Sequence, residues 1–200
     1  MNMMNRRKAI KRMGLSFGYI AATPTVLSIL ESCGKESQIS WTPKFFLENE
    51  AIVIQKLIDL ILPPTDNIPG ALDVDVPQFI DSYYHEVVEI KKGDTFKKGI
   101  NLIINILGDN VAGADMNQYD SLLAKFLKAR QKEIEEFKIN EENNLIYHTL
   151  TNLRSTAVWA FKTSQKIGKE VLAYDPIPVV QIGCMSLDEA TGGKEWSLMN

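Results

Sequence analysis

The chain has 200 residues, of which 45% are hydrophobic and 24% are charged, a balance typical of one globular domain. Residues 1–33 hold 5 of the 22 basic residues and 1 of the 25 acidic ones, so the remainder carries a net charge of −7. Such an acidic surface argues against a nucleic-acid partner. With only Cys33 and Cys184 present, a disulfide framework is excluded as the basis of the fold.

Residues 1–33 have the pattern of an export signal. A basic start is followed by an uncharged stretch over residues 13–30, as in the n-region and h-region of a leader. Arg6 and Arg7, with an aliphatic residue at Ile10, fit the twin-arginine pattern. Glycine, serine, threonine and proline make the stretch too weakly apolar for a membrane span. We predict a twin-arginine signal and a periplasmic protein; the alternative is an amphipathic helix of a cytosolic protein.

The end of this signal contains Cys33 in a lipobox-like setting. Leu30 and Ser32 match the lipobox of bacterial lipoproteins, whereas Glu31 does not. In such proteins the cysteine is acylated and becomes the new N-terminus. We therefore predict a lipid anchor on Cys33, because two or more acyl chains hold a protein stably at a membrane. Ordinary cleavage nearby, with Cys33 incidental, is the alternative.

After a short tether over residues 34–41, residues 42–200 are predicted to form a single helical domain. Thr42 and Pro43 are typical of a helix start, and Pro63 ends the apolar stripe that follows. A second helix is predicted to open at Asp75, in a capping box with Gln78.

The remaining helices follow from caps and periodicity. Gly93 is predicted to end the second helix, and Asp94 to cap a third that stops at Gly108. A fourth is expected over residues 117–137 and a fifth from Asn140 to about Phe161. Because no stretch alternates with period two, the fold class is all-α, a compact domain of about five to six helices.

Two segments between and after these helices contain many prolines and glycines. In residues 60–79 the prolines fix backbone angles in advance, so the loop either packs on a partner or pins two helices. The C-terminal residues 174–196 are predicted to be an extended, Pro/Gly-rich tail that packs on its own domain or on another protein. Cys184 in this tail is expected to be a small buried apolar side chain.

The search for catalytic and metal-binding motifs gives little. The chain has no G-x-G-x-x-G, Walker, C-x-x-C-H or H-E-x-x-H motif, so we expect no nucleotide, haem or zinc in this chain. Asp81, His85 and Glu89 are spaced four apart on the predicted second helix and are the best metal candidate. A solvated helix face explains this spacing better. We therefore assign no catalytic, cofactor-binding or metal-binding residue. The alternative, that this chain is itself an enzyme, rests only on Asp81, His85 and Glu89.

The loop and the tail together resemble the gluconate 2-dehydrogenase subunit 3 family. The resemblance is carried by Leu62-Pro63-Pro64-Thr65-Asp66-Asn67-Ile68-Pro69-Gly70-Ala71, by Val76-Pro77-Gln78-Phe79-Ile80-Asp81, and by Tyr174-Asp175-Pro176-Ile177-Pro178 with Gly183-Cys184 and the residues from Gly192 to Trp196. Members of this family are small subunits of periplasmic sugar or sugar-acid dehydrogenases. Their large subunit is a flavin-dependent oxidoreductase of the glucose-methanol-choline type, and a cytochrome c often takes the electrons.

The resemblance implies an accessory subunit that is not itself catalytic. FAD is then expected in the large subunit, and haem in a cytochrome c subunit where one is present. The residues expected to contact the large subunit are Pro64, Thr65, Asp66, Pro69, Gly70, Pro176, Pro178 and Trp196. The alternative is a free-standing periplasmic lipoprotein that acts as a binding or structural module.

Overall fold

A computed structural model describes residues 39–108, 110–175 and 183–197. The chain divides after Ser40, and the fold reported below is that of the unit from Trp41 to Asn200. The predicted signal, with Arg6, Arg7 and Cys33, lies outside the described residues, as do Pro176 and Pro178 of the tail.

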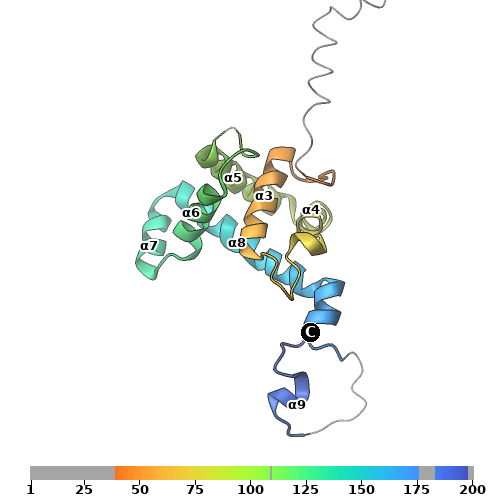
Figure 1. Cartoon of the computed structure of the whole chain (residues 1–200). Coiled ribbons are helices and arrows are strands. Elements are labelled where there is room, and N and C mark those ends of the chain that lie inside the picture. Colours follow the sequence, from red (N-terminus) through yellow and green to blue (C-terminus); the bar gives the residue numbers. More distant parts are fainter. Residues whose placement is uncertain (1–38, 109, 176–182, 198–200) are drawn as a thin grey trace, which may run out of the picture. The chain divides into compact units, whose positions relative to one another are not determined.

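The described part of the chain is helical, which confirms the all-α prediction (Figure 1). In chain order the elements are α3 (Glu48–Ile61), the 3-10 turn η1 (Leu72–Val74), α4 (Val76–Glu86), α5 (Ile90–Leu107), α6 (Met116–Leu127), α7 (Gln131–Ile139), α8 (Glu141–Thr163), the π-helical turn η2 (Ile167–Val171) and α9 (Leu187–Thr191). Helix α8 is central, because it contacts all of α3 to α7. None of the helices in the described ranges is long and apolar enough to cross a bilayer.

The core lies where α3, α5 and α8 meet. The apolar stripes predicted for these helices supply large side chains that are at most 1% exposed: Ile54, Leu57, Ile58, Ile100, Ile103, Leu150 and Leu153. Burying one such side chain contributes about 1.5–3 kcal/mol relative to leaving it in water. Hydrophobic burial therefore supplies the main driving force for this fold.

The prediction that the first helix starts at Thr42 and Pro43 was wrong. Helix α3 begins at Glu48, and Thr42 does not cap it. The preceding segment is instead held by the carboxylate of Asp81, which accepts hydrogen bonds from the backbone amides of residues 44–46 at 2.7, 3.0 and 3.0 Å. These amides have an acceptor outside the helix, so the segment stays irregular.

The predicted boundary at Gly93 and Asp94 was also wrong, since α4 ends at Glu86 and α5 begins at Ile90. Gly93 lies in the first turn of α5 and is buried. A Cβ atom at this position would lie 2.8 Å from Cζ of the Phe45 ring. Here glycine permits a close approach of side chain to backbone and does not stop a helix.

The helix predicted over residues 117–137 is two helices, α6 and α7, and the described residues form seven α-helices in place of five or six. The cap of α6 is Asp115, whose carboxylate accepts from the amide of Asn117 at 3.1 Å. The predicted start of α8 is confirmed, because the Asn140 side chain accepts from the amide of Asn143 at 2.9 Å.

The end of the described chain returns to the domain beside η2. Ala173 and Trp196 form an isolated parallel bridge, in which the Ala173 amide donates to the Glu195 carbonyl at 2.9 Å and the Ser197 amide donates to the Ala173 carbonyl at 2.8 Å. The ammonium of Lys162, on α8, pairs with the Glu195 carboxylate. Residues 195–197 thus pair with the chain directly after η2 and with the end of α8, and Trp196 is 36% exposed.

Two expectations for the tail were wrong. Residues from Leu187 to Thr191 form the short helix α9, because the Ser186 hydroxyl caps it by accepting from the Glu189 amide at 3.2 Å. Cys184, expected to be buried, is exposed.

Candidate partner-binding site

The Pro-rich loop between α3 and α4 is closed by its own hydrogen bonds. At its base the Ala71 amide donates to the Leu62 carbonyl at 2.9 Å. At its tip the Thr65 amide donates to the Ile68 carbonyl at 2.9 Å, and the Ile68 amide donates to the Thr65 hydroxyl at 3.1 Å. With these bonds and the fixed proline angles, the loop presents a preformed shape.

The residues predicted to contact a partner take different positions in this loop. Pro64, Thr65 and Asp66 are exposed, Pro69 is half-buried and Gly70 is buried. The Gly70 amide donates to the Asp73 carboxylate at 2.8 Å. Gly70 therefore sets the shape of the loop, and the exposed tip is the part that can touch another protein.

Gly70→Ala is expected to lower the free energy of unfolding by about 2 kcal/mol, the size of a typical overpacking penalty. The added Cβ would lie 2.7 Å from the backbone nitrogen of Pro64 and 2.8 Å from its Cδ, and neither atom can turn away. Urea denaturation measures the change. Gly183→Ala is the matched control, because its Cβ would meet nothing within 4 Å. Equal stability of the two variants would contradict the tight loop geometry.

The trio Asp81, His85 and Glu89 does not come together. Asp81 is 1% exposed and bonded to backbone amides, whereas His85 and Glu89 are exposed. Helix α4 ends at Glu86, so Glu89 leaves the helical spacing and lies 3.6 Å from the Lys92 ammonium. Among the residues that the structure describes, no group of three or more acidic, histidine or cysteine side chains could hold a metal.

Three aromatic side chains gather on the surface where α4 and α8 pack together, and we call Phe79, Tyr83 and Trp159 the aromatic triad. The ring centroids of Phe79 and Trp159 are 5.3 Å apart, those of Tyr83 and Trp159 are 5.4 Å apart, and those of Phe79 and Tyr83 are 6.3 Å apart. Phe79 is 42% exposed and Trp159 is 47% exposed. A cluster of exposed aromatic side chains is a candidate interaction surface, whereas single exposed apolar residues are common on any protein.

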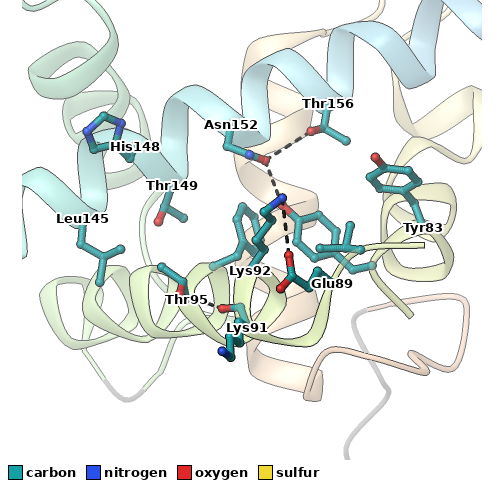
Figure 2. Close-up of a pocket in the computed structure, with 13 residues that line it drawn as sticks. Tyr83, Glu89, Lys91, Lys92, Thr95, Leu145, His148, Thr149, Asn152 and Thr156 are labelled. Atoms are coloured by element: carbon teal, nitrogen blue, oxygen red, sulfur yellow. Dashed lines mark hydrogen bonds and ion pairs between the residues drawn. The ribbon is translucent and has the colours of Figure 1, made fainter. Parts of the chain in front are cut away.

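A groove of about 580 Å³ begins at Tyr83 and runs between α4, α5 and α8 (Figure 2). In its wall the Tyr84 hydroxyl donates to the Asn152 side-chain oxygen at 2.8 Å, and the Thr156 hydroxyl donates to the same oxygen at 3.3 Å. Burial, and then the neighbouring Tyr83, raise the pKa of Tyr84, so its hydroxyl remains a donor at neutral pH. The Asn152 amide nitrogen has no acceptor among the described residues and is free to donate.

The two ends of this groove differ in chemistry. Figure 2 shows Tyr83 at one end and His148 with Leu145 at the other. The charged residues of its wall, Glu89, Lys91 and Lys92, come from the start of α5. A smaller groove lies against Phe79, and of its nine lining residues only Asp75 is charged. The smaller groove is thus lined mostly by uncharged polar residues, whereas the charges of the larger groove lie on its α5 side.

The sequence does not single out the triad, because Phe79 and Tyr83 recur at helical spacing with Val76, Ile80 and Tyr84, a pattern that predicts one buried apolar stripe on the second helix. That stripe holds more apolar residues than one face can bury, and Val87 at its end is 67% exposed. Trp159 lies outside the apolar stripe predicted for residues 145–161. A large aromatic residue off the buried face was the available signal.

These features define an all-α domain with a preformed exposed loop and an exposed aromatic triad. The sequence profile of the gluconate 2-dehydrogenase subunit 3 family matches residues 48–179, which is more than half of the chain. The chain therefore belongs to this family, which confirms the resemblance carried by the loop. Family membership makes it an accessory subunit of a dehydrogenase complex and implies a larger dehydrogenase subunit as its partner. Comparison with curated proteins and with solved structures finds no match.

Proposed function

We propose that this chain is the non-catalytic small subunit of a periplasmic FAD-dependent dehydrogenase of the glucose-methanol-choline type. The complex oxidises a sugar, a sugar acid or a related alcohol, with FAD in the large subunit and haem in a cytochrome c where one takes the electrons. The small subunit supports export, assembly and stability of the catalytic subunit. The observation that carries this proposal is the family match over residues 48–179.

The leader explains how such a subunit assists export. The twin-arginine route carries folded proteins, so a large subunit that has bound its flavin in the cytoplasm can cross together with this chain. Arg6 and Arg7 then serve two polypeptides. After transport, acylated Cys33 holds the complex at the membrane, since two or more acyl chains are sufficient for stable anchoring.

The test is affinity purification of the tagged full chain from membranes of its native host, followed by an absorbance spectrum. We expect flavin bands at close to one flavin per chain. A colourless single chain would overturn the proposal and favour the free-standing lipoprotein.

Substitution of the leader separates its two roles. Replacing both Arg6 and Arg7 with Lys is expected to strand this chain and the flavoprotein in the cytoplasm, because one signal exports both. Cys33→Ser is the control: the complex should still form but no longer fractionate with membranes. Normal export of the flavoprotein beside the Lys variant would contradict the shared-signal mechanism.

A further inference from the structure

We propose that the aromatic triad is the centre of the surface that binds the large dehydrogenase subunit, and that the groove beside Tyr83 receives a segment of that subunit. This inference rests on the proposed function and adds to it a location, because the sequence assigned the contact only to the loop and the tail.

The triad has the properties of a binding hot spot. Aromatic anchors that cluster near the centre of an interface carry most of the binding energy. Each ring of the triad contacts the other two, so the rings are held in place before a partner arrives. Binding then costs little side-chain entropy. Scattered exposed apolar residues such as Ile139 need no partner to explain them.

The helices beneath the triad provide a fixed platform. Asp81 lies between Phe79 and Tyr83 in the sequence and points to the opposite side of α4, where it is 1% exposed and bonded to three backbone amides. Trp159 stands on α8, the helix that contacts five others. The positions of the three rings are therefore set by the core and not by a loop.

The surroundings indicate a protein partner and not a membrane or a nucleic acid. Apolar side chains that enter a membrane surface are normally bordered by lysine and arginine, and single-stranded nucleic acid needs cations beside the aromatic rings. The smaller groove beside Phe79 has one charged residue, the acidic Asp75. In the larger groove Lys91 and Lys92 lie beside the acidic Glu89, whose carboxylate is 3.6 Å from the Lys92 ammonium, so the two lysines are partly balanced. The few charges next to the rings themselves fit the composition found at the centres of protein interfaces.

The groove indicates what the partner presents. A stable interface covers about 800 Å² on each partner, more than three half-exposed rings can supply, so the contact extends into the grooves on either side. In the larger groove the Asn152 amide nitrogen can donate a hydrogen bond to a carbonyl oxygen of the partner. We infer an extended segment of the large subunit with an apolar side chain on the triad and a backbone carbonyl facing Asn152.

The experiment is purification of the tagged full chain from native membranes, with flavin absorbance per chain as the readout. The Phe79→Ala/Trp159→Ala double variant is expected to bring down at least tenfold less flavin than the unaltered chain, and Asn152→Ala is expected to reduce the yield by a smaller factor. Ile139→Ala, at a side chain that is 85% exposed, is the matched control and should change nothing. Helical circular dichroism and urea denaturation check that each variant is folded.

The outcomes separate this inference from the proposed function. If the unaltered chain brings down flavin and the folded double variant brings down as much, the triad is not the interface although the subunit function stands. If the unaltered chain brings down none, the function itself fails and the inference fails with it. Self-association of the chain that the double variant abolishes would make a second copy the occupant and would also overturn the inference.

Discussion

Replacing Asp81 with Ala is expected to lower the free energy of unfolding by about 4 kcal/mol, since hydrogen bonds to a charged group contribute about 1.5–3 kcal/mol each and their loss leaves buried donors unpaired. The carboxylate accepts from the amides of residues 44–46 and is 1% exposed. Without it, this segment has no other acceptor in place. Phe46 is 5% exposed, and its ring centroid lies 5.9 Å from that of Phe96. Without the bond to Asp81, the backbone of Phe46 would no longer hold this ring in the core.

Urea denaturation measures this loss, and hydrogen exchange at the amides of residues 44–46 locates it. Asp81→Asn keeps one acceptor without the charge and should fall between Ala and the unaltered chain. Asp120→Ala, at an exposed carboxylate, is the control and should change stability by less than about 0.5 kcal/mol. Undiminished protection of the three amides in Asp81→Ala would show that the carboxylate does not hold this segment.

The second large effect is expected at Gly99, where α5 crosses α8. A Cβ here would lie 1.9 Å from the Thr149 hydroxyl oxygen and 2.8 Å from the Thr149 Cβ. Rotation of Thr149 can move the hydroxyl, but its Cβ is attached to the backbone of α8 and cannot follow. Gly99→Ala should therefore destabilise the domain by about 3 kcal/mol, at the upper end of overpacking penalties.

The sign of this effect is informative, because replacing glycine by alanine within a helix normally stabilises by about 0.5–1 kcal/mol. Urea denaturation of Gly99→Ala, Thr149→Ala and the double variant tests the contact directly. The two changes should be non-additive, with Thr149→Ala recovering part of the loss. A stabilised Gly99→Ala protein would show that the helices are not in close contact at this crossing.

Part of this architecture followed from local sequence. The apolar spacing of residues 141–161 and the cap at Asn140 predicted α8 closely, because helix periodicity and capping are properties of neighbouring residues. The prolines after α3 likewise predicted a rigid loop, since proline restricts its own backbone. Family membership could be inferred from that same loop.

Other features could not be read locally, because they depend on partners distant in sequence. The irregular start of the domain depends on Asp81, which lies 35 to 37 residues from the amides that it binds. Lys56 shows the same dependence: its ammonium donates to the carbonyls of Val111 at 3.1 Å and Ala112 at 2.6 Å. Burial raises the pKa of Tyr119 to about 12, and its hydroxyl donates to the Val111 carbonyl at 2.9 Å. Lys56 and Tyr119 together hold the loop before α6 in place.

Amino-acid pattern alone was sufficient for the all-α class, the rigid loop and the family, because each arises from short-range backbone preferences or from a contiguous motif. Only tertiary packing determined which apolar residues stay in water. The apolar stripe of α4 is too wide to predict which of its residues face the core. In the folded domain Ile80 is fully buried, whereas Phe79 lies beside Trp159 of α8 on the surface. The aromatic triad is thus a consequence of how α4 and α8 pack together, and the sequence of either helix alone does not predict it.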